Sequence, residues 1–202
     1  MYNEIVIAGS GGQGVLLSGI LIAQTAMRSG LNTTWFPSYG PEMRGGMASS
    51  VTIISNDEIG SPLLFKPNVL VALNELSLNK FICKLSDEAI IVANSSIILH
   101  KKRYKIYPYF IPASYIADKK VGNLKTANMV ILGALIGILE AKDKKNSYKN
   151  SIEEKYITLY DVLLACEEVF LSPKLIEVNK KALKIGYDFI ACTYKKLKRT
   201  SG

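Results

Sequence analysis

The stretch Ile5-Val6-Ile7-Ala8-Gly9-Ser10-Gly11-Gly12-Gln13-Gly14 decides the fold expected for this chain. Its apolar, β-branched start predicts a buried strand, its glycines predict a tight turn, and the apolar residues from Val15 onward predict a helix. A strand, a glycine turn and a helix in this order form a Rossmann-like first βα unit. The backbone N–H groups and the dipole at such a helix start favour anion binding.

Apolar β-branched runs alternate with helical patterns over the rest of the chain, which is typical of α/β proteins. Strands are expected at residues 4–8, 32–36, 50–54, 69–72, 89–93 and 105–107. Helices are expected at residues 14–27, 76–85, 127–139, 159–169 and 173–196. The predicted fold class is therefore α/β, with three layers in which helices cover both faces of a mostly parallel wound sheet.

The length of the chain, 202 residues, is enough for a substantial core, and we expect a single domain over residues 1–202. Thr126 is expected to cap the helix that follows it. That helix carries Gly133 and Gly137 four residues apart, which allows close packing either within the core or between subunits. Residues 142–155 are highly charged and predict an exposed insertion, a loop between two helices.

The net charge of the chain is +8, and the excess lysines and arginines occur in clusters. Such clusters attract acidic partners or form a solvated surface. No aromatic residues alternate with the lysines, so a nucleic-acid partner is not expected. The longest charge-free apolar stretch, 129–139, is shorter than the roughly 20 residues of a membrane span, and no secretion signal is recognised. We therefore expect no membrane partner and a cytoplasmic location.

The cysteines Cys83, Cys166 and Cys192 are far apart and form no C-x-x-C pair. Neither an iron–sulfur cluster nor a zinc site is expected within the chain, and the thiols are interpreted as buried or half-buried in a reducing compartment. The only histidine, His100, lies beside basic residues and is interpreted as a surface residue of a turn. No catalytic residue and no metal ligand is assigned.

Gly9, Gly11 and Gly14 satisfy the G-x-G-x-x-G pattern of dinucleotide sites. The alternative hypothesis is therefore a free-standing Rossmann-type oxidoreductase that binds NAD(P) or a flavin nucleotide. That fingerprint also needs an acidic residue at the end of the second strand, where this chain has Phe36-Pro37-Ser38. Gln13 either contacts a ligand or braces the neighbouring loop, and the glycines otherwise only permit a tight turn.

A second glycine-rich loop, Tyr39-Gly40-Pro41-Glu42-Met43-Arg44-Gly45-Gly46, follows the second strand. Tyr39 provides an aromatic ring and a hydroxyl, and the Gly-Pro pair predicts a turn. Arg44, flanked by glycines, is suited to bidentate binding of a phosphate or carboxylate. A structural pair of Glu42 with Arg44, or a contact of Arg44 with another subunit, explains the same residues.

Four motifs follow one another along the chain. They are Gly11-Gly12-Gln13-Gly14, the stretch from Ser38 to Gly46, Ile59-Gly60-Ser61-Pro62, and Gly122-Asn123 with Ala127-Asn128-Met129. In this order and spacing the chain resembles the gamma subunit of 2-oxoacid:ferredoxin (acceptor) oxidoreductases, most closely the 2-oxoglutarate type. The resemblance extends over residues 1–140 and more loosely over the C-terminal helices.

The resemblance implies a multi-subunit enzyme that oxidatively decarboxylates a 2-oxoacid, forms acyl-coenzyme A and passes electrons to ferredoxin or a similar acceptor. It implies that partner subunits, including thiamine-binding and ferredoxin-like ones, hold thiamine diphosphate and iron–sulfur clusters. This chain, inactive alone, then binds no cofactor firmly. In isolation it is expected to be able to form a homodimer.

By the same resemblance, one set of residues is expected to face coenzyme A, a co-substrate, or the partner subunits. These residues are Gly11, Gly12, Gln13, Gly14, Tyr39, Gly40, Glu42, Arg44, Gly45, Gly46 and Asn128.

Overall fold

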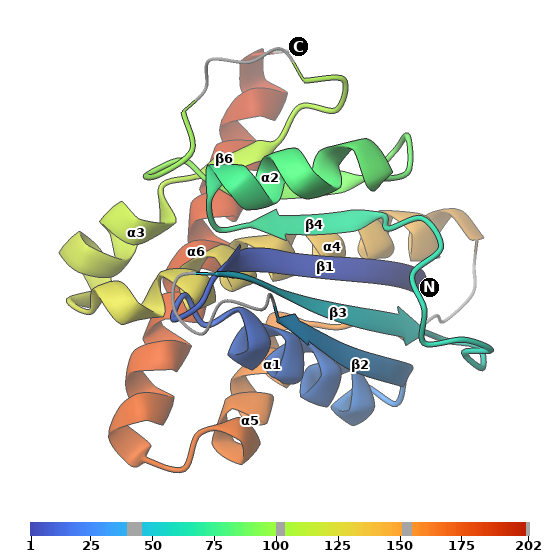
Figure 1. The fold of residues 1–202 in the computed structure, drawn as a ribbon, viewed down its shortest axis with the longest axis horizontal. Helices are drawn as coiled ribbons and strands as arrows, with labels where there is room; N and C mark the ends of the chain where they lie inside the picture. The colour runs from blue at the N-terminus through green and yellow to red at the C-terminus, as the bar shows by residue number, and fades with distance from the viewer. Residues whose placement is uncertain (40–45, 100–103, 151–154, 201–202) are drawn as a thin grey trace.

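The computed structural model describes residues 1–39, 46–99, 104–150 and 155–200. The sheet has six strands. Figure 1 shows helices on both of its faces, which confirms the predicted α/β class. The strands are β1 (Tyr2–Ser10), β2 (Asn32–Tyr39), β3 (Met47–Ser55), β4 (Val69–Ala72), β5 (Ile90–Asn94) and β6 (Tyr109–Ile111). The helices are α1 (Val15–Arg28), α2 (Glu75–Phe81), α3 (Ala113–Ile116), α4 (Ala127–Asn150), α5 (Leu159–Val169) and α6 (Pro173–Thr200). Shorter turns are η1 (Ile82–Lys84), η2 (Ala117–Val121, a π-helix) and η3 (Leu124–Thr126).

The strand order is β2-β3-β1-β4-β5-β6. Strands β1, β4, β5 and β6 pair in parallel, as predicted, whereas β3 lies antiparallel between β1 and β2. The sheet is therefore mixed. A short connection suffices between the antiparallel strands β2 and β3, while parallel neighbours need a longer crossover.

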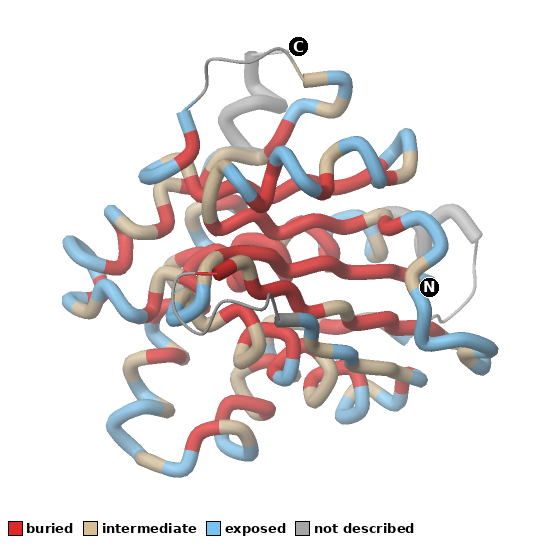
Figure 2. Tube along the Cα trace, in the orientation of Figure 1, coloured by how far each residue is buried: buried red, intermediate tan, exposed pale blue. Residues whose placement is uncertain are grey.

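Two hydrophobic clusters cover the two faces of the sheet. Ile5 and Ile7 of β1 belong to the cluster that contains residues of α1, α4, α5 and α6, whereas Val6 and Ala8 belong to the cluster that contains residues of α2. Figure 1 shows α2 in front of the sheet and α4 and α6 behind it. The buried residues follow the central strands (Figure 2), as expected for strands covered on both faces.

Glycines at the crossing of α4 and α6 bring the two helix backbones together. A Cβ on Gly133 would overlap the backbone carbonyl of Leu183, and a Cβ on Gly186 would overlap that of Val130. Gly137, one turn further along α4, faces the side chain of Tyr187. Of the two interpretations left open by the sequence, close packing within the chain is therefore the one observed.

Three local predictions were wrong. The last strand is β6 rather than 105–107, because Lys105 is exposed and pairs with Asp87 (Nζ to Oδ1, 2.7 Å), while Ile111 enters the core. Thr126 ends η3 instead of capping a helix, and its hydroxyl donates to the Asn123 carbonyl (2.8 Å).

The third wrong prediction concerns the loop at 142–155. Residues 142–150 continue α4, while 151–154 lie outside the described residues. An i,i+4 ion pair between Glu140 and Lys144 (2.5 Å) supports this charged helical extension.

The segment Leu124–Lys144 is long and apolar enough to cross a membrane by length and composition alone. However, 78% of its most apolar window is buried inside the structure. This segment contains the first part of α4, which packs against the sheet and α6 as a core helix.

Candidate functional site

The two glycine-rich loops meet at the carboxyl edge of the sheet. The turn Gly11–Gly14 follows β1, and the end of the second loop precedes β3, the neighbour of β1. The Gly11 N–H donates to the Gly46 carbonyl (2.9 Å), and the Gln13 N–H donates to the Ser10 carbonyl (3.1 Å). The structure thus joins the two motifs that the sequence singled out.

Gln13 braces this edge. Its side-chain oxygen accepts hydrogen bonds from the Ser10 N–H (2.7 Å) and from Asn74 Nδ2 (3.1 Å). Asn74 also caps α2, since its Oδ1 accepts from the Ser77 N–H (2.9 Å). Gln13 therefore braces its own turn and links the ends of β1 and β4.

Asn128 holds the start of α1 from the opposite side. Its Nδ2 donates to the Gly14 carbonyl and to Ser18 Oγ, each at 3.2 Å. Gly14 has a φ of 72°, and a Cβ there would overlap the Asn128 amide. Both the left-handed backbone and the close approach of Asn128 require glycine at this position.

A crevice of about 800 Å³ opens beside the glycine turn. It lies at the carboxyl ends of β1, β4 and β5, where ligands of wound sheets usually bind. Its lining residues are Gly12, Gln13, Leu73, Asn94, Ile97, Ser114, Gly122, Asn123, Leu124, Lys125, Ala127 and Asn128.

The crevice combines side-chain amides and a hydroxyl with apolar walls and one positive charge. Asn94 is anchored by Ser114, since Asn94 Nδ2 donates to Ser114 Oγ (2.9 Å). Asn123 Oδ1 accepts a hydrogen bond from the Lys125 N–H (3.1 Å). This bond orders the backbone at the rim of the crevice, where Lys125 lies. Lys125 is the only titratable side chain among the described lining residues. Such a lining suits a ligand with amide groups and negative charge better than one that needs acid–base catalysis.

Only some of the predicted site residues lie at the crevice. Gly12, Gln13 and Asn128 line the crevice, while Gly11, Gly14 and Gly46 form its supporting backbone. Tyr39 ends β2, and the position of its side chain is not described. The remaining predicted residues of the second loop, Gly40, Glu42, Arg44 and Gly45, lie outside the described residues.

Sequence reasoning missed Asn74, Asn94, Ser114 and Lys125. Asn74 and Asn94 follow or end apolar strands, so they lie at the same edge as the glycine turn once the strands are parallel. That position was a usable signal, because carboxyl ends of parallel strands converge on one edge. Ser114 and Lys125 had no comparable local signal.

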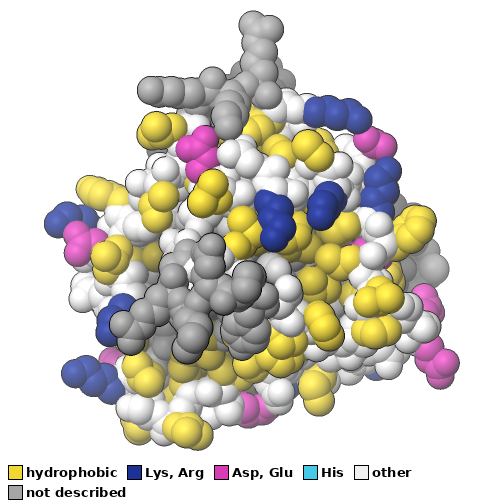
Figure 3. All heavy atoms as spheres, in the orientation of Figure 1, with side chains coloured by type: hydrophobic (Ala, Val, Ile, Leu, Met, Phe, Trp, Pro, Cys, Tyr) yellow, Lys and Arg dark blue, Asp and Glu magenta, His cyan; other side chains and the backbone are white. Residues whose placement is uncertain are grey.

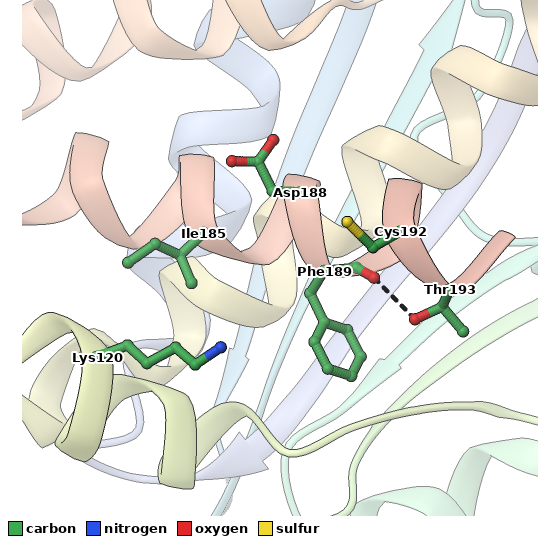
Figure 4. A pocket seen from close by; sticks show the side chains of 6 residues that line it. All are labelled: Lys120, Ile185, Asp188, Phe189, Cys192 and Thr193. Carbon is green, nitrogen blue, oxygen red and sulfur yellow. Dashed lines mark hydrogen bonds between the residues drawn. The ribbon is translucent and has the colours of Figure 1, made fainter. Parts of the chain in front are cut away.

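A separate groove lies between η2 and α6 (Figure 4). Its volume is about 430 Å³, and it is lined by Lys120, Ile185, Asp188, Phe189, Cys192 and Thr193. The Thr193 hydroxyl donates to the Phe189 carbonyl within α6 (2.8 Å). Its lining is mainly apolar and lacks a nucleophile–base pair at hydrogen-bond distance in the described chain.

The cysteines divide into two environments. Cys166 is buried, whereas Cys83 and Cys192 are exposed, which corrects the prediction that all three are at least half-buried. Within the described ranges, no group of three or more His, Cys, Asp or Glu side chains is placed to hold a metal ion. His100 lies outside those ranges.

The strand order argues against the dinucleotide alternative. In a dinucleotide fold the strand after the first helix lies beside β1 and presents the ribose-binding carboxylate near the glycine turn. Here β3 separates β2 from β1. The glycine pattern therefore serves a different architecture, in which the neighbouring strand brings a second glycine-rich loop.

A mixed sheet whose first βα turn contacts Gly46 before β3, beside an amide-lined crevice, defines an α/β domain with a candidate ligand site at the carboxyl edge of its sheet. The family of pyruvate ferredoxin/flavodoxin oxidoreductases matches residues 4–189. The chain belongs to this family, which confirms the resemblance stated from the motifs.

Two relatives align with most of this chain. The ketoisovalerate oxidoreductase subunit VorA of Methanothermobacter marburgensis is 32% identical over 186 residues, which are 92% of this chain and 36% of that protein. The 2-oxoglutarate synthase subunit KorC of the same organism is 34% identical over 174 residues, covering 79% of this chain and 94% of that protein. The chain therefore spans about a third of the VorA-type relatives and most of the KorC-type ones.

Solved structures share the fold. A keto/oxoacid ferredoxin oxidoreductase gamma subunit from Geobacter sulfurreducens superimposes with a TM-score of 0.75 at 24% identity, covering 94% of this chain and 99% of that one. A 2-oxoglutarate:ferredoxin oxidoreductase from Magnetococcus marinus gives a TM-score of 0.77 at 21% identity, covering 95% of this chain and 31% of that one.

Proposed function

We propose that this chain is the gamma subunit of a multi-subunit 2-oxoacid:ferredoxin oxidoreductase. The enzyme oxidatively decarboxylates a 2-oxoacid, transfers the acyl group to coenzyme A and passes the electrons to ferredoxin or a similar acceptor. The observation that carries this proposal is the family match over 4–189, together with relatives named as a ketoisovalerate oxidoreductase subunit and a 2-oxoglutarate synthase subunit. We infer 2-oxoglutarate as the 2-oxoacid and a cytoplasmic location; the free thiols fit a reducing compartment.

Coenzyme A is proposed to bind in the crevice beside the glycine turn. The Magnetococcus structure was solved with 2-oxoglutarate, coenzyme A and succinyl-CoA bound. The pantetheine arm of coenzyme A carries amide groups that can pair with the partly exposed side-chain amide of Asn123, and Lys125 provides positive charge for a phosphate. Asn94 and Asn128, which are buried and hydrogen-bonded within the chain, form the polar wall of the crevice. Coenzyme A supplies the thiol that accepts the acyl group; this chain's residues bind and orient it.

Thiamine diphosphate and the iron–sulfur clusters are proposed to belong to partner subunits. The crevice offers amides and one lysine, without the thiolate set that a cluster needs, so its residues do not fit an iron–sulfur group. The reaction is therefore expected to require thiamine-binding and ferredoxin-like chains alongside this one.

Reconstitution tests the proposal. The purified chain should show no 2-oxoglutarate oxidation, and activity should appear only when the co-expressed partner chains are present. Full turnover by the isolated chain would refute the assignment, and so would the absence of any thiamine-binding chain from the purified complex.

A variant of Lys125 tests the coenzyme A side. In the assembled enzyme, Lys125→Ala should raise the KM for coenzyme A about tenfold, because a charge-assisted contact of an exposed lysine contributes about 1.4 kcal/mol, near the low end for such contacts. The rate of 2-oxoacid decarboxylation should change little. Lys174→Ala, an exposed lysine at the start of α6, is the matched control. An unchanged KM for coenzyme A in Lys125→Ala would contradict the binding of coenzyme A in this crevice.

A further inference from the structure

We propose that the side-chain nitrogen of Gln13 donates a hydrogen bond to a carbonyl oxygen of the ligand in the crevice. Asn74 is the positioning residue that fixes the direction of this donor. The ligand class is a molecule with amide carbonyls, which in coenzyme A belong to the pantetheine arm. The identity of this ligand rests on the proposed function.

Two backbone N–H groups determine which way two side-chain amides point. The Ser10 N–H donates to Gln13 Oε1 (2.7 Å), and the Ser77 N–H donates to Asn74 Oδ1 (2.9 Å). Because a backbone N–H can only donate, the atom that faces it in each amide must be the oxygen. The nitrogen of each amide therefore has a defined position.

The nitrogen of Asn74 holds the oxygen of Gln13 in place. Asn74 Nδ2 donates to Gln13 Oε1 (3.1 Å) and to Ser10 Oγ (2.9 Å). Gln13 Oε1 thus accepts two hydrogen bonds, one for each of its lone pairs. A Cβ on Gly9 would lie 2.7 Å from the same oxygen, so glycine at this position lets the Gln13 side chain lie against the end of β1.

The nitrogen of Gln13 is open to a ligand. Within the part of the chain that the structure describes, Gln13 Nε2 donates no hydrogen bond and is not enclosed by the protein. Gln13 is also one of the residues that line the crevice. An amide nitrogen can donate but cannot accept, so Gln13 offers a donor of fixed direction to an acceptor atom in the crevice. A donor that is ordered before binding loses little conformational freedom when the ligand arrives.

The surroundings of this donor favour an uncharged acceptor. Lys125, the only titratable side chain among the described lining residues, belongs to η3, whereas Gln13 follows β1 and shares its side of the crevice with the apolar Leu73. A phosphate is matched by the lysine, and a neutral carbonyl by the neutral amide. Positive charge alone marks no site in this chain, because Figure 3 shows Lys and Arg side chains spread over the face that carries α2.

Gln13→Glu in the assembled enzyme separates the donor from the brace. One carboxylate oxygen can still accept from the Ser10 N–H and from Asn74 Nδ2, while the other replaces the NH₂ group and can only accept. The KM for coenzyme A should rise about tenfold or more, and the Tm should stay that of the wild type. Asn32→Asp is the matched control, because it adds the same charge at an exposed position on the opposite edge of the sheet. Its KM should equal that of the wild type.

Asn74→Ser tests the positioning residue. Serine caps a helix about as well as asparagine, so α2 keeps its cap while Gln13 loses the Nδ2 donor. The KM for coenzyme A should rise about threefold. In a Gln13→Ala background the same substitution should leave the KM unchanged, because no amide is left to orient. An equal rise in both backgrounds would show that Asn74 acts independently of Gln13 and would overturn its assigned role.

The remaining outcomes separate this inference from the proposed function. An unchanged KM in Gln13→Glu, or an equal rise in Asn32→Asp, would overturn the inference and leave the proposed function standing. Pantetheine, tested as a competitor of coenzyme A, locates the acceptor: its Ki should rise in Gln13→Glu by the same factor as the KM. An unchanged Ki would move the contact to the phosphate-bearing part and overturn the inference. If the assembled wild type forms no acyl-coenzyme A, the proposed function fails, and the ligand named for Gln13 fails with it.

Discussion

Two glycines at the carboxyl edge of the sheet show what a sequence pattern predicts and what the structure adds. Gly12 and Gly14 both have positive φ, but a Cβ on Gly12 would meet nothing within 4 Å, whereas one on Gly14 would overlap Asn128. The glycine at Gly12 is therefore needed only for its backbone conformation, while that at Gly14 also allows the Asn128 side chain to reach the helix start. A sequence pattern treats these glycines alike because it contains no information on the distant Asn128.

Cys166 provides a pH-dependent test at the same scale. Burial raises the pKa of its thiol from an ordinary value of 9.0 to about 12. Between these two pH values the unfolded chain has lost the proton and the folded chain keeps it, so stability falls as the pH rises. The contribution is at most about 1.4 kcal/mol per pH unit. Below pH 9 the thiol has no such effect.

Urea unfolding of the wild type and Cys166→Ala between pH 8 and about 11 measures this effect. The free energy of unfolding should fall more steeply with pH in the wild type than in the variant, because all other titrating groups are shared. Parallel curves would contradict the assignment. Cys83→Ala, at an exposed position, is the control and should follow the wild type.

At the scale of elements, the helix crossing of α4 and α6 organises one side of the molecule. Its glycines lie against backbone carbonyls of the partner helix, so the helices approach more closely than side chains would allow. Glu140 adds polar contacts at this junction: its Oε2 accepts from the Leu159 N–H and from the Tyr187 hydroxyl, each at 3.2 Å. This carboxylate therefore joins α4 to the start of α5 and to α6.

Replacing Gly133 tests the crossing. Gly133→Ala should lower the free energy of unfolding by about 1–3 kcal/mol, because a backbone carbonyl cannot move away as a side chain can. Gly137→Ala should stay within about 1 kcal/mol of the wild type, since its neighbours are side chains and alanine favours the helix. Chemical denaturation measures both, and equal losses in the two variants would contradict a backbone contact at Gly133.

At the scale of the whole molecule, the two faces of the sheet are unequal. One face is covered by α1 and α4, with α5 and α6 outside them, while the other carries α2 and the surrounding loops. The face covered by α1 and α4 carries the larger cluster of buried residues.

Calorimetry tests the single-domain prediction together with assembly. The isolated chain should unfold in one cooperative transition. A partner in about hundredfold excess over its Kd should add roughly 2.7 kcal/mol of stability and raise the Tm by about 5–10 °C. Two separate transitions of the isolated chain would contradict a single domain over 1–202.

Local elements could be predicted from the amino-acid sequence alone. The expected bounds of β4 and α5 agree with the structure, because a continuous apolar run and a capped amphipathic run are local signals. The Thr158–Asp161 capping box at the start of α5 is an example of such a signal. The ordered motifs also determined the family, because they depend only on residue identity and spacing.

The way these elements combine became visible in the folded structure alone. It placed β3 between β1 and β2, joined Gly11 to Gly46, and brought Asn74, Asn94 and Asn128 to one edge of the sheet. It also showed that residues 142–150 continue α4. The physical reason is that strand order, helix crossings and crevice linings depend on pairing between residues far apart in the chain, which no local propensity encodes.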